Sequence, residues 1–516
     1  MKFIRRTLSE RHYTVILVAV AVLSLIPTLA GTPLFDEDEG YFAEVSREML
    51  ETGNFITAHL NGTPEYDKPI LIYWLQAASF RVFGLNEFAA RLPSAVATFL
   101  WVMALYGFVR RYLNHRTAFL SGLFLISAVQ ITITGKAAIS DALLNLFLAL
   151  TMFRFYDYVH RRNVRCLYAA FLYAGLGFLT KGPVAVVVPA AVGFLFCLFQ
   201  RRLSLWLRAV FNPVGILIFL AVALPWYVLE YLDQGDAFIR DFFFKHNLER
   251  FQSPMEGHGG SFLYFIPVVL IGTLPHSGLW IPMVSRLKSW WRQPVLMFGM
   301  IWFGFVFLLF SLAGTKLPHY IIYGYTPLFI LYALTFQEIE KFRAYFLPVV
   351  LFLLVLTVLP ALVPVAAPFV TDPFAVLVMA SAPEYFGLSY YLLCGGLLIL
   401  LVAVFYFRRP ERTKFALLVS IAVLIVINLA LMPRVGALMQ GPVKEAALIA
   451  RQRNYDVVMW GYYLPSFIFY SGKFVAQRNP AAGDILITKR THLEELKAYE
   501  VIFEKNGIVL AKVIEP

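Results

Sequence analysis

The sequence predicts a polytopic α-helical membrane protein with a small α/β domain after its last span. Three observations support this fold class. First, 59% of the 516 residues are hydrophobic and only 15% are charged, whereas soluble domains are roughly 45–50% apolar and about 25% charged. Second, several apolar segments exceed the ~18 residues that mark a membrane span. Third, the composition changes from about residue 440, where short apolar runs alternate with polar ones.

A basic segment with Lys2, Arg5, Arg6 and Arg11 precedes the first apolar run. Because cytoplasmic segments are enriched in Lys and Arg, we expect a cytoplasmic N-terminus. The apolar run is long, and no convincing small-residue cleavage site precedes the acidic stretch that follows it. We therefore expect a retained first span at roughly 14–33 rather than a cleaved signal.

The first outer segment, 34–92, contains two candidate amphipathic helices at about 40–52 and 70–83, which would lie along the membrane interface. It opens with four consecutive carboxylates, Asp36 to Glu39. Such a run cannot lie in hydrocarbon, so we expect it at a membrane surface or in a wet cavity.

Basic clusters between the apolar runs fix the direction of the later spans. Span 2, roughly 93–109, returns to Arg110 and Arg111, and alternating spans place every later strongly basic cluster on this same side. The net charge of +12 therefore reflects membrane topology and gives no indication of nucleic-acid binding. The outer side then receives the tips 135–141, 179–183 and 315–320, the long loop 231–261 after span 7 (roughly 210–230), and a Pro-rich loop near 364–386.

Span 13, roughly 415–432, places the C-terminus outside. The sequence thus predicts a transmembrane domain over 1–435 with about 13 helices and a soluble outer α/β domain over 440–516. In that domain we expect strands at 456–460, 484–488, 500–503 and 508–511 and helices at 465–471 and 491–499. Thr491 followed by Glu494 would form the capping box of the second helix.

The predicted topology gathers carboxylates and lysines on the outer side, at span ends or in outer loops: Asp36 to Glu39, Asp67, Lys68, Lys136, Asp141, Lys181, His246, His258, Lys316 and His319. Ionisable residues at such positions are usually functional and paired. A carboxylate can act as a base, and lysines bind phosphate as point charges. Because nucleotide sugars and ATP are not supplied outside, a phosphate there belongs to a lipid, which suggests group transfer from a polyprenyl carrier.

Each of these residues also has a purely structural interpretation. Asp38 and its neighbours would favour the N-terminal dipole of an interfacial helix, and Asp141 would cap span 4. Lys68, Lys181 and Lys316 would extend their ammonium groups to the interface. The three cysteines, Cys166, Cys197 and Cys394, lie inside apolar segments and are interpreted as small core residues.

Several motifs resemble, in the expected order, those of the GT-C glycosyltransferases related to aminoarabinose transferase and the protein O-mannosyltransferases. The resemblance covers roughly residues 10–330. The motifs are Asp38-Glu39-Gly40-Tyr41-Phe42-Ala43-Glu44, Arg47-Glu48-Met49-Leu50, Tyr66-Asp67-Lys68-Pro69, Tyr73-Trp74, Ser140-Asp141-Ala142, Leu179-Thr180-Lys181-Gly182-Pro183, His246 with Arg250-Phe251, and Lys316-Leu317-Pro318-His319-Tyr320. The chain departs from the pattern at Tyr41, where such relatives usually have arginine, and at Asp67, where glutamate is expected.

This resemblance implies a GT-C fold and inverting transfer of a sugar from undecaprenyl phosphate, or another polyprenyl phosphate, to an acceptor on the outer face. Asp38, with Glu39 second, would be the catalytic carboxylate, and Asp141 would position acceptor or donor. The lipid phosphate and donor would be bound by Lys68, Lys181, Lys316, Tyr66 and Tyr320. Some relatives hold a divalent ion nearby, and Asp67 with His258 would be the ligands here; no nucleotide cofactor is expected.

The resemblance also implies location in a bacterial inner membrane, with the site and C-terminus in the periplasm. The acceptor would be lipid A, another envelope glycan or a protein, and a protein O-mannosyltransferase stays open. A transporter or flippase should show repeated halves and polar residues near the bilayer midplane, which the sequence does not show. A membrane scaffold would leave the one-sided set of carboxylates and lysines unexplained.

Overall fold

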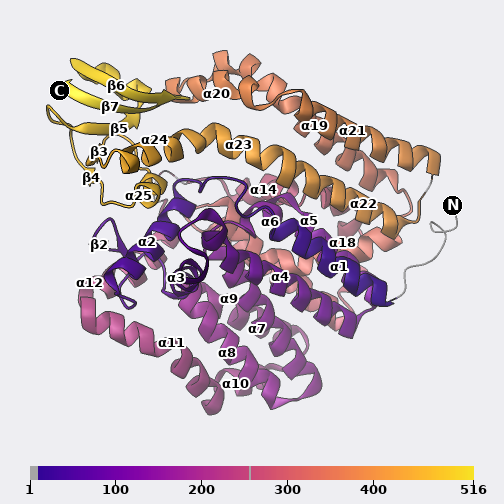
Figure 1. Ribbon diagram of the computed structural model, residues 1–516. Helices are drawn as coiled ribbons and strands as arrows, with labels where there is room; N and C mark the ends of the chain where they lie inside the picture. The colour runs from indigo at the N-terminus through magenta and orange to yellow at the C-terminus, as the bar shows by residue number, and fades with distance from the viewer. Residues whose placement is uncertain (1–9, 255–256, 258, 409) are drawn as a thin grey trace.

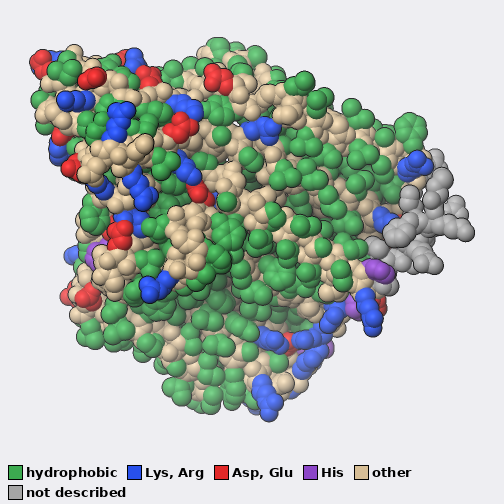
Figure 2. All heavy atoms as spheres, in the orientation of Figure 1, with side chains coloured by type: hydrophobic (Ala, Val, Ile, Leu, Met, Phe, Trp, Pro, Cys, Tyr) green, Lys and Arg blue, Asp and Glu red, His purple; other side chains and the backbone are tan. Residues whose placement is uncertain are grey.

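The structure is a computed structural model that describes residues 10–254, 257, 259–408 and 410–516. Figure 1 shows long helices packed side by side, with a small sheet at one end, near α2 and α25. Figure 2 shows hydrophobic side chains covering most of the surface between the charged groups of the sheet end and a mainly basic cluster at the lower right. Lys2, Arg5, Arg6, His258 and Arg409 lie outside the described residues.

The described residues contain seven helices that are long and apolar enough to cross a membrane, or eight if a pair bent by 112° counts as one span. The protein is therefore a multi-pass membrane protein. The seven are α4 (Glu87–Tyr112), α7 (Asp141–Arg161), α11 (Pro213–Gln234), α17 (Pro294–Leu312), α19 (Arg343–Ala366, continued by η6, Ala367–Phe369), α21 (Leu388–Ala403, continued by η7, Val404–Arg408) and α22 (Arg412–Ile425, continued by η8, Val426–Leu431, and α23, Met432–Met439).

The remaining predicted spans fall on shorter helices or on the bent pair. These are α1 (Glu10–Leu25), α5 (His115–Ser127) with α6 (Val129–Thr134), α8 (Val164–Lys181), α9 (Val184–Phe199), α14 (Phe265–Gly272, after η3, Phe262–Tyr264) with η4 (His276–Leu279) and α15 (Trp280–Val284), and α18 (Tyr325–Glu338). The prediction that span 1 continues to about residue 33 is wrong. Helix α1 ends at Leu25 because Pro27 disfavours helical geometry in the residue before it.

The first outer segment has the two helices that the sequence predicts. Helix α2 (Asp38–Thr52) has two carboxylates in its first turn and ends at Gly53, whose φ of 72° suits glycine. Helix α3 (Leu71–Phe83) follows a short hairpin of β1 (His59–Leu60) and β2 (Thr63–Pro64). Helix α2 is buried on nearly all sides, between α3, α25 and the transmembrane helices, whereas α3 buries one face, so the segment packs closely at one end of the bundle.

The second outer segment is more helical than the sequence predicts. Helix α11 continues to Gln234, and α12 (Asp236–Phe238), the π-helix η2 (Ile239–Glu249) and α13 (Arg250–Gln252) occupy most of the predicted loop 231–261. The Pro-rich segment near 364–386 likewise contains α20 (Pro373–Tyr385), which the Asp372 side chain caps. Short helices α10 (Leu203–Val210) and α16 (Leu287–Trp290) and the 3-10 helix η5 (Pro318–Gly324) connect the remaining segments.

The C-terminal region is a mixed sheet flanked by helices, as the sequence predicts. Its five strands, β3 (Val457–Met459), β4 (Ala476–Gln477), β5 (Ile485–Lys489), β6 (Ala498–Lys505) and β7 (Ile508–Glu515), lie in the order β4-β3-β5-β7-β6. Strand β3 is parallel to β4 and β5, whereas β7 is antiparallel to β5 and β6. Helices α24 (Gly441–Gln452) and α25 (Pro465–Ser471) connect this sheet to the first outer segment.

The predicted helix 491–499 is wrong. Residues Arg490–Glu495 form a single 3-10 segment, η9, and Ala498 already begins β6. The antiparallel pairing of β6 with β7 outweighs the local helix signal, because tertiary pairing routinely overrides propensity.

Candidate active site

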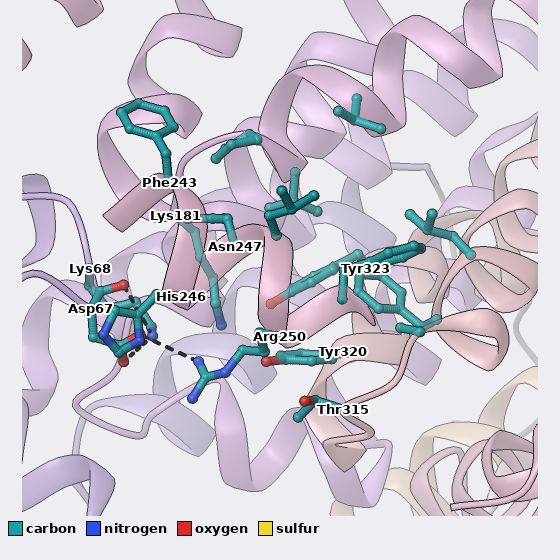
Figure 3. A pocket seen from close by; sticks show the side chains of 18 residues that line it. Asp67, Lys68, Lys181, Phe243, His246, Asn247, Arg250, Thr315, Tyr320 and Tyr323 are labelled. Carbon is teal, nitrogen blue, oxygen red and sulfur yellow. Dashed lines mark hydrogen bonds and ion pairs between the residues drawn. The ribbon is translucent and has the colours of Figure 1, made fainter. Parts of the chain in front are cut away.

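A cavity of about 450 Å³ lies among the ends of α8, α9 and α17, with η2 and η5 completing its wall. One part of its lining is basic, with the cations Lys68, Lys181 and Arg250 beside His246, and another is apolar, with residues such as Val184, Val187, Leu309 and Phe310. In Figure 3, Lys181 and Arg250 lie between Asp67 on one side and Tyr320 and Tyr323 on the other. We call this space the cationic cavity.

Asp67 is in contact with three basic side chains. Its carboxylate contacts Lys68 Nζ, His246 Nδ1 at 3.1 Å and Arg250 Nη1 at 3.4 Å. Burial alone would raise the pKa of Asp67, but Lys68, with His246 and Arg250, outweighs burial and holds that pKa well below its usual range. Lys68 and Arg250 are thus held by the Asp67 carboxylate.

This environment does not fit a divalent-metal site at Asp67, since the side chains of Lys68, His246 and Arg250 already contact its two oxygens. No group of three or more His, Cys, Asp or Glu side chains suited to a metal occurs in the part of the chain that the structure describes. His258, the second predicted ligand, lies outside that part. The metal site stays a prediction.

Asp141 and Lys181 form a second buried ion pair beside the cationic cavity. Lys181 Nζ lies 2.8 Å from Oδ1 and 2.9 Å from Oδ2 of Asp141, and the Tyr323 hydroxyl donates to Oδ1 at 2.8 Å. Lys181 Nζ also lies 5.7 Å from the ring centroid of Tyr320 and 5.6 Å from that of Tyr323. These contacts hold the ammonium at the cavity wall.

Asp38 lines a second cavity of about 350 Å³, bounded by the residues after α1, by α6, by η8 and by the start of α23. Among the described residues, its carboxylate has no hydrogen-bond or ion-pair partner. Asp38 is exposed to the cavity, but the protein around its carboxylate still excludes part of the water, which raises the pKa of Asp38 with a contribution from the Asp141 charge, while Lys68 and Lys181 oppose that increase. Asp38 is therefore a free carboxylate within the field of both ion-pair clusters.

The same second cavity is lined by His319 and Lys136. Burial lowers the pKa of His319 to about 4, although Asp141 opposes the shift, so its imidazole is neutral near pH 7. Lys136 Nζ donates to Thr28 Oγ1 at 3.0 Å and to Asn428 Oδ1 at 2.6 Å. Hydroxyl, amide, imidazole and carboxylate groups therefore share this space, which suits a polar ligand.

Glu39 points away from free solvent, and both of its carboxylate oxygens are satisfied. Arg91 donates to Oε1 at 2.8 Å and to Oε2 at 2.6 Å, and the backbone N–H groups of Ala138 and Phe35 donate at 2.8 and 3.0 Å. Burial raises the pKa of Glu39, but Arg91 and these bonds outweigh burial and lower it. Glu39 thereby fixes the start of α2, next to Asp38, against α4 and the loop before Asp141.

The remaining predicted residues lie in different surroundings. Tyr320 lines the cationic cavity. Tyr66 is outside the cavity lining, and its hydroxyl donates to Gln234 Oε1 at 2.7 Å. Lys316 is only 6% exposed and donates to the carbonyl of Ala313 at 2.5 Å, and it does not line the cavity either.

Three residues that contribute to the site were missed. Arg91 neutralises Glu39, Tyr323 donates to Asp141, and Asn247 lines the cationic cavity. The sequence contained a signal for two of these residues. Arg91 is a charged residue at the start of a long apolar run, and Tyr323 follows the predicted site residue Tyr320 by three positions. Asn247 offered no such signal.

The sequence has relatives among known transferases. Residues 67–228 match a family described as dolichyl-phosphate-mannose-protein mannosyltransferase. A protein from Aeromonas salmonicida named undecaprenyl phosphate-alpha-4-amino-4-deoxy-L-arabinose arabinosyl transferase is 33% identical over 326 residues, which cover 61% of this chain and 58% of the relative. One of the same name from Photorhabdus laumondii is 32% identical over 60% of this chain and 57% of the relative.

Solved structures share the fold. The structure of ArnT from Cupriavidus metallidurans bound to undecaprenyl phosphate superposes with a TM-score of 0.80 at 21% identity, covering 98% of this chain and 100% of the other. The archaeal oligosaccharyltransferase AglB from Archaeoglobus fulgidus gives a TM-score of 0.52 at 13% identity, covering 92% of this chain and 65% of the other. The expected GT-C fold and the resemblance are confirmed.

Proposed function

Because this chain has the GT-C fold and is related in sequence to aminoarabinose and mannosyl transferases, we propose that it is an integral-membrane inverting glycosyltransferase. It moves a sugar from a polyprenyl phosphate carrier, of which undecaprenyl phosphate is the bacterial form, to an acceptor at the outer face. The matched segments cover less than two thirds of each relative. The activity of this chain is therefore proposed from the residues of its own site and not from the names of the relatives alone.

The observation that carries the proposal is the division of the cationic cavity into a charged part and an apolar part. Lys68, Lys181 and Arg250 supply positive charge that can bind a phosphate. Val184 and Leu309 form part of the apolar wall. Phosphates favour lysine and arginine donors, and an isoprenoid chain favours aliphatic walls. A lipid phosphate matches both parts at once.

In the proposed reaction, the acceptor oxygen attacks the anomeric carbon of the sugar from the side of Asp38. A new carbon–oxygen bond forms, the bond from that carbon to the carrier phosphate oxygen breaks, and the configuration inverts. Asp38 takes the proton of an acceptor hydroxyl, or orients an acceptor that is already ionised. Its raised pKa makes it a better proton acceptor than an ordinary aspartate.

The leaving phosphate gains negative charge as that bond breaks. Lys68, Lys181 and Arg250 stabilise this charge in the transition state, and the Tyr320 ring beside Lys181 restricts the ammonium. Asp141 orients Lys181 through their two short contacts. Glu39 supports Asp38 from behind rather than reacting, because its oxygens already accept four hydrogen bonds.

The second cavity, lined by Asp38, His319 and Lys136, is the proposed acceptor side. Lipid A or another envelope glycan is the preferred acceptor class, because relatives at 29–33% identity are named aminoarabinose transferases. A protein acceptor rests only on the family match over residues 67–228 and on more distant structures. The flippase alternative gains no support from these relatives.

The proposed topology has thirteen crossings of a bacterial inner membrane, with the N-terminus in the cytoplasm. The transmembrane domain over 1–435 carries the site on the periplasmic side, and the α/β domain over 440–516 lies there as well. The positive-inside distribution supports this orientation. Cysteines placed at Lys68 and at Arg111 should be labelled by an impermeant reagent from opposite sides; labelling from one side would contradict it.

The function is tested with purified protein, undecaprenyl phosphate sugars and lipid A. Asp38→Asn should bind undecaprenyl phosphate within threefold of the wild type, because the cationic cavity is unchanged. It should lose at least 100-fold in turnover, because the carboxylate that takes the acceptor's proton is gone. Exposed Asp456→Asn is the matched control. Full transfer by Asp38→Asn would refute its role, and mass spectrometry of envelope glycolipids and glycoproteins with and without the protein would identify sugar and acceptor.

A further inference from the structure

The C-terminal domain contacts the chain at the residues that surround Asp38. Helix α25 packs on α2, and their side chains share one hydrophobic cluster with members such as Ala43, Phe467 and Ile468. The approach is close: a Cβ atom at Gly40 would lie 2.4 Å from the backbone nitrogen of Ser466. Only glycine permits this contact, so α2 and α25 meet backbone to backbone.

Asp36 makes the polar part of this contact. Its Oδ1 accepts a hydrogen bond from the Ser466 backbone N–H at 2.8 Å, and its Oδ2 accepts one from the Ser466 hydroxyl at 2.5 Å. Asp36 lies two residues before Asp38, just before α2 begins. Both oxygens of this carboxylate are therefore used to hold α25.

The other end of α25 holds the chain just before Asp36. The Tyr470 hydroxyl accepts from the backbone N–H of Leu34 at 2.7 Å and donates to Glu87 Oε1 at 2.9 Å, and Lys444 pairs with the same Glu87 carboxylate. Residues 34, 36 and 40 are thus fixed from one side by a single short helix.

A third contact fixes the hairpin that leads to Asp67 and Lys68. The Asn61 side chain donates to the Val475 carbonyl at 2.7 Å and accepts from the Val475 N–H at 2.9 Å. These two hydrogen bonds are made by the asparagine of Asn61-Gly62-Thr63, which also matches a glycosylation sequon. The C-terminal domain therefore contacts the first outer segment both beside Asp38 and at the hairpin that precedes Lys68.

We propose that the C-terminal domain is a structural part of the active site and that Asp36 and Ser466 are positioning residues, which set the place of the Asp38 carboxylate through their paired hydrogen bonds. This inference rests on the proposed function. It assigns to Asp36 a role distinct from that of Asp38, although both belong to one run of carboxylates. It predicts that weakening the contact slows transfer without weakening lipid-phosphate binding.

The test compares Ser466→Ala, Ser466→Thr, Asp36→Asn and the double variant Asp36→Asn with Ser466→Ala. Ser471→Ala is the matched control, because Ser471 lies on the same helix but bonds only to the Ile468 carbonyl. We expect Ser466→Ala to lower kcat about tenfold while the donor KM and the Kd for undecaprenyl phosphate stay within twofold. Ser466→Thr, which keeps the hydroxyl, should recover to within threefold of the wild type.

The double variant should be no slower than the slower single variant, since both changes remove one shared contact. A labelling experiment gives a readout besides activity. With Asp38→Cys as the probe, the rate of thiol modification at position 38, followed by peptide mass spectrometry, should change at least threefold with Ser466→Ala and stay unchanged with Ser471→Ala.

Wild-type kcat in Ser466→Ala with unchanged labelling would overturn the inference. Equal losses in Ser466→Ala and Ser471→Ala, or losses that multiply in the double variant, would do the same. If the wild type transfers no sugar from a polyprenyl phosphate, the proposed function fails, and the labelling rates alone then decide the role of the contact.

Discussion

Replacing Lys181 or Lys316 with methionine should show which of these two lysines binds the lipid phosphate, a difference that the sequence did not reveal. Lys181 lies at the wall of the cationic cavity, whereas Lys316 bonds to the carbonyl of Ala313 and lies outside the lining. A hydrogen bond to a charged group contributes about 1.5–3 kcal/mol. At 1.4 kcal/mol per tenfold change, Lys181→Met should weaken undecaprenyl phosphate binding roughly 10- to 100-fold, and Lys316→Met should stay within threefold.

Among the described residues, the Lys181→Met variant also leaves the Asp141 carboxylate with only the Tyr323 hydroxyl as a hydrogen-bond partner, and breaking a buried ion pair costs about 3–5 kcal/mol of stability. The double variant Asp141→Asn with Lys181→Met removes this unpaired charge and should keep the binding defect while regaining thermal stability. Binding is measured by isothermal titration in detergent, and folding by size exclusion and thermal unfolding. Binding by Lys181→Met within threefold of the wild type, or weaker binding by Lys316→Met than by Lys181→Met, would refute this reasoning.

Three further changes test the surroundings of the site. Arg91→Met leaves the Glu39 carboxylate buried and unpaired, so it should lower the free energy of unfolding by about 3–5 kcal/mol; a Tm equal to that of the wild type would contradict this. Burial raises the pKa of Asp36 from 3.8 to about 7, so the folded state holds a proton that the unfolded state has lost; this contribution to stability is present below pH 4 and lost as pH rises through 7. Asp36→Asn should therefore reduce the fall in Tm between pH 4 and 8, and an unchanged fall would argue against it. A Cβ atom at Gly314 would lie 2.7 Å from the backbone of Ser253, so Gly314→Ala should displace the segment after η2 and weaken lipid-phosphate binding several-fold in the same titration, whereas wild-type binding would count against that packing.

The sequence predicts the convergence of the site better than the contacts within it. Alternation of spans and basic clusters was enough to predict that Asp67, Lys68, Asp141 and Lys181 lie on one side. Asp67, Lys68 and Lys181 do line one cavity, and Asp141 pairs with Lys181 beside it. The direction of a side chain depends on packing that no local pattern encodes. Lys316, which resembles the other two lysines in sequence, turns to a backbone carbonyl instead.

Contacts between residues that are far apart in the sequence could not be predicted either. Glu39 meets Arg91 from another helix, and nothing in the acidic run distinguishes its satisfied carboxylate from the free one of Asp38. The segment 231–261 was expected to be a long loop, but it contains α12, η2 and α13. Its Phe242 is buried, and a Cβ atom at Gly182 would lie 2.8 Å from the Phe242 ring, so tertiary packing supports the helix that local composition does not favour.

The bond between Asp36 and Ser466 joins residues 430 positions apart. At roughly 5–20 residues per second, a ribosome makes the second partner about 20–90 s after the first. In the proposed topology, the acidic stretch reaches the periplasmic side during that interval without its α25 partner. Assembly of the reaction centre is therefore a late event in biosynthesis, so a truncated or stalled chain would be inserted in the bilayer yet inactive.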